Sequence, residues 1–171
     1  MTLDEVKATY GAIVQNWAQQ LGVPPSAGTL SDYVDVVCGI IFKESQGNPN
    51  AVGDGGCSIG LMQLNTCAGT PQSFGYVPGT DNLFDPTTNI GYGCKYLNSL
   101  LGQYSLPQAI SAYNAGSPTS SNVSSYVNVV VGYARQLGST LATAFQANPI
   151  VFVAIGGAFI LGVIYISKTK K

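Results

Sequence analysis

The sequence predicts a mainly α-helical, α+β domain with one small β or irregular region, followed by a single C-terminal transmembrane helix. Three observations predict this fold class. Apolar residues recur at helical spacing through most of the first 146 positions. Glycine, proline and asparagine concentrate between residues 47 and 60, and such residues interrupt helices. Residues 149–166 are uncharged and mostly apolar, and their length is close to that of a helix that crosses about 30 Å of hydrocarbon.

The N-terminal part of the chain contains two predicted helices. Thr2 and Glu5 have the spacing of a capping box, which predicts the start of the first helix. Its apolar face comprises Leu3, Val6, Tyr10, Ile13, Trp17 and Leu21. A loop over residues 22–28 precedes a second helix from near Ser31, whose core face comprises Val34, Val37, Cys38 and Ile41. We expect residues 1–30 to pack on a main domain of residues 31–146.

Three further helices are predicted after the irregular region. A loop covers roughly residues 69–85, and Asp85 then caps a helix with Pro86 at its first position. The core face of this helix comprises Ile90, Cys94, Leu97 and Leu101. Pro107 opens a short helix that ends near Gly116, and a last helix begins at about Val123 and runs toward the apolar segment.

Residues 147–167 form the predicted transmembrane helix, which makes a lipid membrane an expected partner. The alternative, a buried core helix, is weaker because such helices are usually shorter and keep one polar face. Small residues at 154, 158 and 162 would permit close helix pairing in a homo-oligomer or with other membrane proteins. The basic tail at 168–171 favours a cytoplasm-like side for the C-terminus. The chain opens on an acidic stretch, so we expect no N-terminal signal peptide.

The composition limits the catalytic and metal-binding groups that the chain can offer, because it contains few charged residues and no histidine. Of 171 residues, 7 are Lys or Arg and 8 are Asp or Glu, a charged fraction of 9% against about 25% in a typical domain. The lack of histidine excludes Ser-His-Asp and Cys-His catalysis and imidazole metal sites. The scattered basic residues argue against nucleic acid as a partner. We therefore expect no cofactor and no metal, and acid–base chemistry from very few carboxylates.

Four cysteines, Cys38, Cys57, Cys67 and Cys94, allow three pairings. No close CxxC pair exists, which argues against a zinc site. Two disulfides in an oxidising compartment are expected, with Cys57–Cys67 favoured because these two residues bracket the most informative stretch of the chain. In the alternative, Cys38 and Cys94 are small buried hydrophobic residues.

Glu44 is the carboxylate for which the sequence offers no ordinary structural role. The chain has two glutamates, and the capping box explains Glu5. Glu44 continues the apolar face of the second helix, where lost hydration would raise the pKa of its carboxyl. A carboxylic acid protonated near neutral pH is what glycosidic-bond cleavage requires. In the alternative interpretation, Glu44 is a solvated residue near a helix end.

Four motifs follow one another at domain-scale spacing. Residues 44–51 read ESQGNPNA, residues 60–65 read GLMQLN, residues 85–90 read DPTTNI with Gly93, Tyr96 and Leu97 behind them, and residues 112–116 read AYNAG. Together they resemble the soluble lytic transglycosylase family, whose fold is related to goose-type lysozyme. The resemblance covers roughly residues 34–135. The chain departs from the family at Thr66, where many members have a proline nearby, and in its cysteines, which are not a family signature.

The resemblance implies a peptidoglycan lytic transglycosylase domain over residues 31–146. Glu44 matches the catalytic glutamate, which protonates the oxygen between N-acetylmuramic acid and N-acetylglucosamine of the glycan strand. It then acts as base on the 6-hydroxyl of the same sugar and leaves a 1,6-anhydromuramoyl end. The matching substrate-binding residues are Ser45, Met62, Gln63, Asn65, Tyr113 and Asn114. Their amide, aromatic and thioether groups suit hydroxyl and amide groups and sugar rings.

Structural roles compete with several of these assignments. Gly60 and Gly116 are interpreted as residues that serve the backbone conformation and do not contact substrate. The expected core residues are Leu61, Leu64, Tyr96 and Leu97. Met62 could belong to the core as well, and Ser45 and Asn65 could be local caps. We place these two below Gln63 and Tyr113.

Two other functions are retained as alternatives. In a lysozyme-like hydrolase a second carboxylate activates water, and Asp54 is the nearby candidate, although a turn role explains it adequately. In a structural or wall-binding protein the groove is kept and the chemistry lost. A tail-anchored wall lysin resembles the virion enzymes of bacteriophages with an internal membrane, which implies local wall penetration during genome entry. The alternative location is the bacterial cell envelope.

Overall fold

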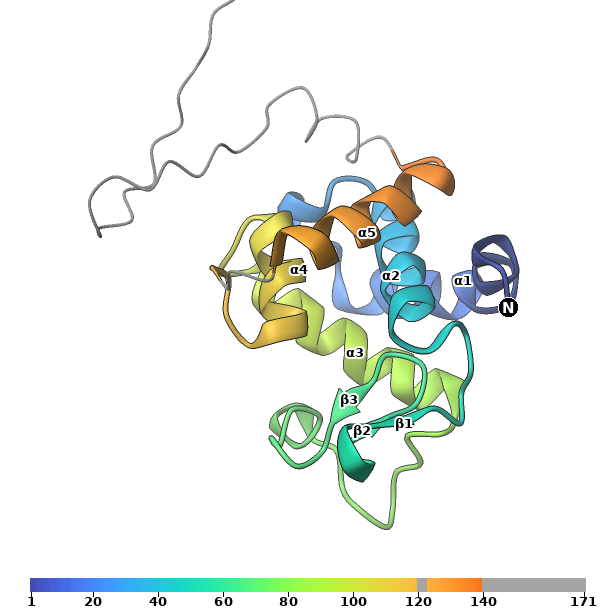
Figure 1. Ribbon diagram of the computed structural model, residues 1–171, viewed down its shortest axis with the longest axis vertical. Helices are drawn as coiled ribbons and strands as arrows, with labels where there is room; N and C mark the ends of the chain where they lie inside the picture. The colour runs from blue at the N-terminus through green and yellow to red at the C-terminus, as the bar shows by residue number, and fades with distance from the viewer. Residues whose placement is uncertain (120–122, 140–171) are drawn as a thin grey trace, which may run out of the picture.

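Five α-helices carry most of the structure in residues 1–119 and 123–139, the part of the chain that this computed structural model describes (Figure 1). The helices are α1 Leu3–Leu21, α2 Leu30–Ser45, α3 Pro86–Leu101, α4 Leu106–Ala115 and α5 Val123–Gln136. Short 3-10 turns cover Pro25–Ala27, Asp54–Gly56 and Gln72–Phe74. The predicted mainly helical class is therefore confirmed for the described residues.

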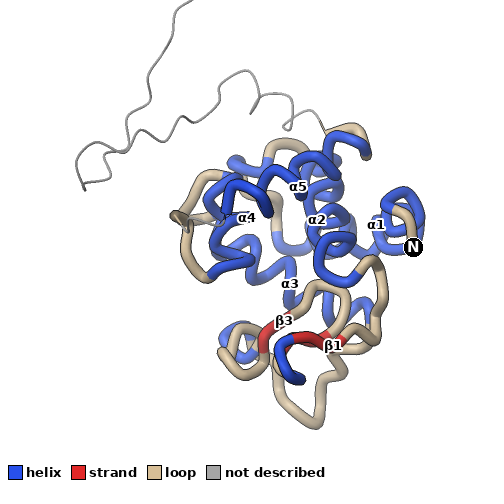
Figure 2. Tube along the Cα trace, in the orientation of Figure 1, coloured by secondary structure: helices blue, strands red, loops and turns tan. Residues whose placement is uncertain are grey.

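The predicted small β region is a three-stranded antiparallel sheet of order β1-β2-β3. Its strands are β1 Val52–Gly53, β2 Ser58–Ile59 and β3 Leu64–Asn65. Val52 pairs with Ile59, and Ile59 pairs in turn with Leu64. Figure 2 shows these strands among loops at one end of the molecule, below the helices. We call residues 47–85, which include the sheet and the loops that follow it, the small lobe.

Helix α2 lies at the centre of the helical part. It packs against α1 on one side and α5 on another, while α3 contacts α1 and α4, and α4 contacts α5 (Figure 1). The strand β3 contacts α3, so α3 joins the small lobe to the other helices. The C-terminal end of α2, which holds Glu44, therefore points toward the junction between the helices and the small lobe.

Hydrogen-bonded caps fix where the helices begin. The Thr2 amide donates to Glu5 Oε2 at 2.7 Å and the Glu5 amide donates to Thr2 Oγ1 at 3.2 Å, which confirms the predicted capping box. Thr29 and Asp32 form a second capping box, so α2 begins one residue before the predicted position. Asp85 Oδ2 accepts from the Thr88 amide at 2.8 Å, as predicted. Each cap stabilises its helix by about 1 kcal/mol.

The core face of α1 differs in part from the prediction. Leu3, Val6 and Tyr10 are buried as expected, but Val14 and Ala18 continue the buried face. The predicted Ile13 and Trp17 are only partly buried, and Leu21 is 37% exposed. A helix turns about 100° per residue, so positions four and eight after a buried residue remain close to its face. The true face therefore follows the spacing 10, 14, 18.

The structure contains one of the two predicted disulfides and not the second. Cys57 and Cys67 are bonded, with their Cα atoms 5.3 Å apart. Cys38 and Cys94 are free and buried, so the expectation of two disulfides is wrong and the alternative for these two residues is correct. Burial raises the pKa of each free thiol to about 12, which keeps it protonated and unreactive at neutral pH.

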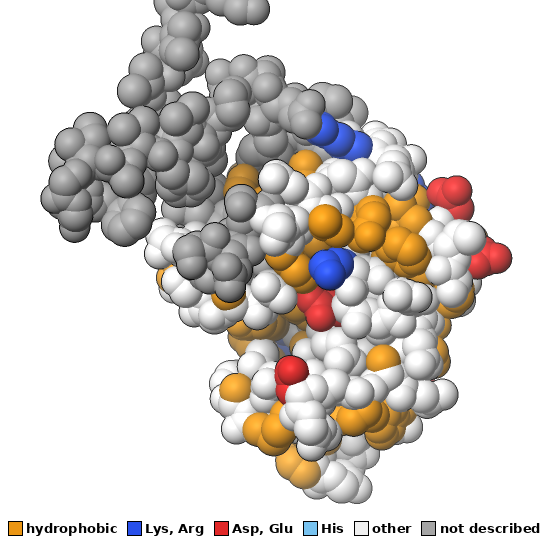
Figure 3. All heavy atoms as spheres, viewed as in Figure 1, with side chains coloured by type: hydrophobic (Ala, Val, Ile, Leu, Met, Phe, Trp, Pro, Cys, Tyr) orange, Lys and Arg blue, Asp and Glu red, His pale blue; other side chains and the backbone are white. Residues whose placement is uncertain are grey.

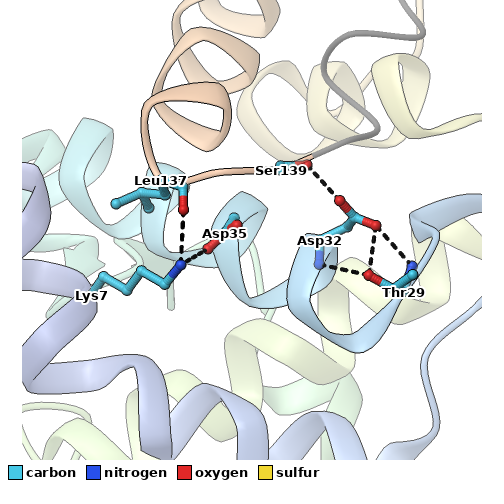
Figure 4. Close-up of polar contacts among 6 residues, drawn as sticks. All are labelled: Lys7, Thr29, Asp32, Asp35, Leu137 and Ser139. Carbon is cyan, nitrogen blue, oxygen red and sulfur yellow. Dashed lines mark hydrogen bonds and ion pairs between the residues drawn. The ribbon is translucent and has the colours of Figure 1, made fainter.

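A polar cluster ties the end of α5 to α1 and α2 (Figure 4). Lys7 Nζ lies 2.5 Å from Asp35 Oδ1, and it donates to the Leu137 carbonyl at 3.0 Å. Ser139 Oγ donates to Asp32 Oδ1 at 2.9 Å. Burial raises the pKa of Asp35, and the adjacent Lys7 opposes that shift. The cluster therefore holds residues 137–139, directly after α5, against α1 and α2.

None of the helices within residues 1–119 and 123–139 is long and apolar enough to cross a membrane. The predicted transmembrane helix at 147–167 and the basic tail at 168–171 lie outside the described residues.

Candidate active site

A groove with a cavity of about 180 Å³ lies between the small lobe and helices α3 and α4. Four predicted substrate-binding residues line it: Gln63, Asn65, Tyr113 and Asn114. Tyr96, which was expected in the core, also lines the groove and is only partly buried. None of the residues that line the groove is charged, and the face drawn in Figure 3 carries few charged side chains, so a ligand in the groove would meet mainly aromatic, amide and hydroxyl groups.

Glu44 lies in the last turn of α2, and the residue is partly buried. The hydroxyl of Tyr126 donates a short hydrogen bond to Glu44 Oε1. Burial raises the pKa of Glu44, and the charge of Asp54 adds to this rise. The hydrogen bond from Tyr126 and the charge of Lys43 act in the opposite direction without cancelling it. The carboxyl therefore stays protonated to a higher pH than an exposed glutamate does.

Tyr126 is a residue of the site that sequence reasoning missed. It lies on α5, is 6% exposed, and comes 82 positions after Glu44. Burial and the neighbouring charge of Glu44 raise the pKa of its hydroxyl, so the phenol keeps its proton and remains a donor. Tyr126, Val130 and Ala134 share a buried helix face at spacing of four. That spacing could have shown that Tyr126 points inward, but no pattern identifies its partner.

Tyr113 connects α4 to the GLMQ turn at residues 60–63. Its hydroxyl donates to the Met62 carbonyl at 2.9 Å, and its ring lies 5.0 Å from that of Tyr96. Burial raises the pKa of Tyr113, and the charge of Glu44 contributes to the rise. Asn114 is exposed, and Gly116 ends the helix with φ +67°, the backbone role predicted for it.

The GLMQ turn is built around a glycine that tolerates no side chain. Gly60 has φ +75°, and a Cβ there would come within 2.3 Å of Asn89 Nδ2 and 2.4 Å of the Leu83 carbonyl. Gln63 also has a left-handed φ, +46°, and its Nε2 donates to the Gly60 carbonyl at 3.0 Å. Gln63 therefore both braces the turn and lines the groove.

Met62 does not take the substrate-binding position expected from the GLMQ motif. Its side chain is completely buried, and its thioether packs so closely on α3 that a Cβ on Gly93 would lie 2.2 Å from Sδ. Met62 therefore belongs to the core, together with Leu61, Leu64 and Leu97. Its backbone still contributes to the site, because its carbonyl accepts the Tyr113 hydroxyl.

Ser45 and Asn65 both have local hydrogen-bond partners. Ser45 Oγ donates to the Ile41 carbonyl at 3.1 Å within α2. Asn65 Oδ1 accepts from the Ala68 amide at 2.8 Å while the residue lines the groove. The local roles considered for these two residues are therefore present, and only Asn65 is among the groove-lining residues.

Asn89 is a second residue whose role the sequence did not reveal. It is fully buried, and its Nδ2 donates to the carbonyls of Ile59 and Leu83, both at 2.9 Å. Its Oδ1 accepts from the Met62 amide at 2.9 Å. One side chain of α3 thus holds the hairpin, the GLMQ turn and the loop before α3. Asn89 lies in the DPTTNI motif, and its place in that motif is the feature of the sequence that could have indicated its importance.

Asp54 lies at the start of the 3-10 turn after β1, with φ +49°. Its Oδ2 accepts from Ser58 Oγ at 2.6 Å, which agrees with the predicted turn role. It is exposed, and its charge contributes to the raised pKa of Glu44. Within residues 1–119 and 123–139, no group of three or more His, Cys, Asp or Glu side chains is placed to hold a metal ion.

Two comparisons with known proteins point to the same family. The transglycosylase SLT domain matches residues 29–130. The chain is 35% identical over 127 residues to a membrane-bound lytic murein transglycosylase C of Haemophilus influenzae (strain PittEE). This match covers 66% of the chain and 33% of the relative, so the chain spans about a third of that protein's length. No solved structure matches the chain. On the family match over most of the helical domain, the chain belongs to the transglycosylase SLT domain family.

Proposed function

We propose that this protein is a peptidoglycan lytic transglycosylase. It cleaves the β-1,4 bond between N-acetylmuramic acid and N-acetylglucosamine and leaves a 1,6-anhydromuramoyl end. The observation that carries the proposal is Glu44, a partly buried carboxyl with a raised pKa that accepts a hydrogen bond from Tyr126. Glu44 is not among the residues that line the groove, which supplies aromatic and amide side chains for a glycan. The family match supports the same reaction class.

The reaction needs one carboxyl group in two successive roles. Glu44 gives its proton to the glycosidic oxygen, and the bond between that oxygen and C1 of N-acetylmuramic acid breaks. The resulting oxocarbenium-like centre at C1 is attacked by the 6-hydroxyl of the same sugar. The hydroxyl proton passes to the Glu44 carboxylate, which restores the starting acid. Atoms balance without water, and no second carboxylate is required.

Tyr126 is the proposed positioning residue for this acid. Because its hydroxyl donates to Oε1 of Glu44, the acidic proton is carried by Oε2. The same hydrogen bond strengthens when the carboxyl becomes negative after the first proton transfer. Tyr126 thus stabilises the carboxylate at the moment when it must act as base. The rings of Tyr96 and Tyr113 supply apolar surface for a sugar ring.

A second candidate function is hydrolysis, with Asp54 as the second carboxylate. The charge of this exposed residue contributes to the raised pKa of Glu44, and an inverting hydrolase needs a second carboxylate to activate water. Muropeptide analysis of Glu44→Gln and Asp54→Asn separates the two functions. We expect Glu44→Gln to abolish wall lysis and Asp54→Asn to keep most of it. Loss of activity in both variants, together with wild-type products that lack the anhydro end, would favour the hydrolase.

A catalytically inactive wall-binding protein is tested by zymography on peptidoglycan. We expect the wild-type chain to clear the gel and Glu44→Gln to bind without clearing it. Binding without clearing by the wild-type chain would favour the inactive alternative.

We further propose that residues 147–167 anchor the enzyme in a membrane and that the enzyme opens the wall locally during phage genome entry. The uncharged composition of residues 149–166 supports the anchor. Proteomics of purified virions and of host membranes tests the location. Detection in host membranes alone would favour a bacterial envelope enzyme instead.

A further inference from the structure

Helix α1 precedes residues 29–130, the part of the chain that matches the SLT domain. It nevertheless packs along α2, the helix that carries Glu44. Tyr10 lies in the middle of α1 and is only 6% exposed. Neither Tyr10 nor any other residue of α1 lines the groove. An effect of α1 on the proposed reaction would therefore act through α2 rather than through contact with the glycan.

The backbone turns sharply directly after Glu44 and Ser45. Gln46 closes α2 through its amide, which donates to the Phe42 carbonyl at 3.0 Å. Gln46 and Gly47 both have left-handed backbone conformations, with φ +53° and +77°. Such a conformation is disfavoured for a residue with a side chain and persists where surrounding contacts hold it. The position of the last turn of α2, and of the Glu44 carboxyl on it, therefore depends on what holds this bend.

Tyr10 holds the bend from the side of α1. Its hydroxyl donates a buried hydrogen bond to the Gly47 carbonyl at 3.0 Å. Burial raises the pKa of Tyr10, so the hydroxyl keeps its proton and remains a donor. The packing is tight, because a Cβ on Gly47 would come within 2.9 Å of Val6 Cγ2 on the same face of α1. Gly47, three residues after Glu44, is thus both packed on α1 and hydrogen-bonded to it.

Lys7 fastens α1 to both of the helices that meet at the candidate acid. Its ammonium lies 2.5 Å from Asp35 Oδ1 on α2, and it donates to the Leu137 carbonyl, directly after α5, at 3.0 Å. Helix α2 supplies Glu44, and α5 supplies the Tyr126 hydroxyl that donates to it. Both helices are therefore held against α1, which fixes the position of the other side chains on this face of α1.

We propose that Tyr10 is a positioning residue for Glu44. By holding the Gly47 carbonyl, it keeps the last turn of α2 where the Glu44 carboxyl meets the Tyr126 hydroxyl. The inference rests on the proposed function, because it assigns Tyr10 a role in the rate of the reaction that Glu44 carries. Since Tyr10 is not among the groove-lining residues, its loss should lower kcat and leave KM unchanged.

The first test follows the Glu44 carboxyl directly by NMR. The sequence has two glutamates, so carbon-13 labelling of glutamate side chains gives two carboxyl signals from the full chain in detergent. The signal that disappears in Glu44→Gln belongs to Glu44, and its titration gives the pKa of this carboxyl. The measurement requires no substrate and no turnover.

The titration of Glu44 reports its distance from Tyr126. The charged and titratable groups that interact with Glu44 are Lys43 on α2, Asp54 in the small lobe, Tyr113 on α4 and Tyr126 on α5. Tyr10→Phe keeps all of them and removes one hydroxyl. Because the hydrogen bond from Tyr126 lowers the pKa of Glu44, a carboxyl that moves away from it has a higher pKa. We expect a rise of about 0.5 in Tyr10→Phe and no rise from the same change in a Tyr126→Phe background.

The second test measures kcat and KM on soluble glycan strands. We expect Tyr10→Phe to lower kcat about fivefold, as the loss of one hydrogen bond would, and to keep KM within about twofold of wild type. In the Tyr126→Phe background the same change should lower kcat by less than about twofold, because the contact through which Tyr10 acts is already absent.

Trp17→Phe is the matched control on the same helix. It keeps an aromatic ring and removes the hydrogen bond from the Trp17 indole to the Thr87 carbonyl of α3, which is 3.0 Å long, without touching the bend at Gly47. The kcat of this variant and the pKa of its Glu44 should equal those of wild type. Thermal unfolding compares the stability of the two variants, because a purely structural loss would lower kcat in the control as well.

The outcomes separate this inference from the proposed function. An unchanged or lowered pKa of Glu44 in Tyr10→Phe would overturn the inference, and so would an equal loss of kcat with and without the Tyr126 hydroxyl. If the wild-type chain cleaves no glycan, the proposed function fails. The titration of Glu44 would then still decide whether Tyr10 positions this carboxyl.

Discussion

The hydroxyl of Tyr126 on α5 donates a hydrogen bond to Oε1 of Glu44 at the end of α2, across 82 positions of sequence. This contact joins the last described helix to the residue that we propose as acid and base. It lowers the pKa of Glu44 and thereby opposes the larger effect of burial, which raises it. Two helices thus set the pKa of Glu44. Burial at the end of α2 raises it, and the hydrogen bond from Tyr126 on α5 lowers it.

Tyr126→Phe removes this hydrogen bond and keeps the ring. Because the hydrogen bond lowers the pKa of Glu44, its loss raises that pKa further. The alkaline limb of the pH–rate profile should move to higher pH, and the maximal rate should fall about tenfold as the acid loses its fixed orientation. Tyr133→Phe on the same helix is the control, since Tyr133 packs on Phe42. A limb that moves to lower pH would contradict the assigned role.

Glu44→Gln should abolish activity and yet stabilise the fold at neutral pH. Activity should fall by about two to four orders of magnitude. Because burial raises the pKa of Glu44 in the folded state, its stabilising contribution is complete below the ordinary value of 4.5 and is lost as pH rises through the folded pKa. Glutamine never ionises and still offers an oxygen to Tyr126.

Thermal unfolding at several pH values checks this prediction. We expect the Tm of Glu44→Gln to exceed that of wild type at neutral pH and the difference to vanish below pH 4.5. The control is Gln15→Ala at an exposed position of α1, which should leave Tm nearly unchanged across the range. A lower Tm for Glu44→Gln at neutral pH would show that the carboxylate stabilises the fold.

Asn89→Ala should destabilise the protein and disorder the groove. It removes the partners of the Met62 amide and of the Ile59 and Leu83 carbonyls at a fully buried position. We expect a loss of about 3 kcal/mol or more in the free energy of unfolding, measured by chemical denaturation. The exposed Asn16→Ala should change it by less than about 0.5 kcal/mol. Similar values for the two variants would show that Asn89 does not hold these three segments.

Reduction of the Cys57–Cys67 disulfide should lower the free energy of unfolding by about 2–3 kcal/mol, because the bond closes a short loop in the unfolded chain. The double variant Cys57→Ser, Cys67→Ser should not respond to reductant. A thiol count on the denatured, unreduced chain should give two, from Cys38 and Cys94. A count of zero would show that these two residues are bonded as well.

Local features of this protein could be predicted from the sequence, because their causes lie within a few residues. The capping box at Thr2 and Glu5, the glycine of the GLMQ turn and the partial burial of Glu44 all follow from neighbouring positions. The favoured disulfide also closes a short loop. These features depend on helix and turn geometry, which the local sequence contains.

The remaining features depend on packing between distant segments. Tyr126 reaches Glu44 only once α5 has docked on α2, and no local pattern marks that contact. Met62 belongs to a motif that is typical of a substrate pocket, but its thioether packs against Gly93 in the core. Cys38 and Cys94 lie on core faces as predicted, whereas their pairing depends on interhelical distances that a sequence does not contain.

Digestion of purified peptidoglycan by the full chain in heavy-oxygen water, followed by mass spectrometry of the new muramoyl ends, tests whether the 6-hydroxyl or water attacks C1. Intramolecular attack by the 6-hydroxyl involves no solvent oxygen. We therefore predict 1,6-anhydromuramoyl ends without label, formed by wild type and Asp54→Asn and not by Glu44→Gln. Reducing ends that carry the heavy oxygen would contradict the account and identify a hydrolase.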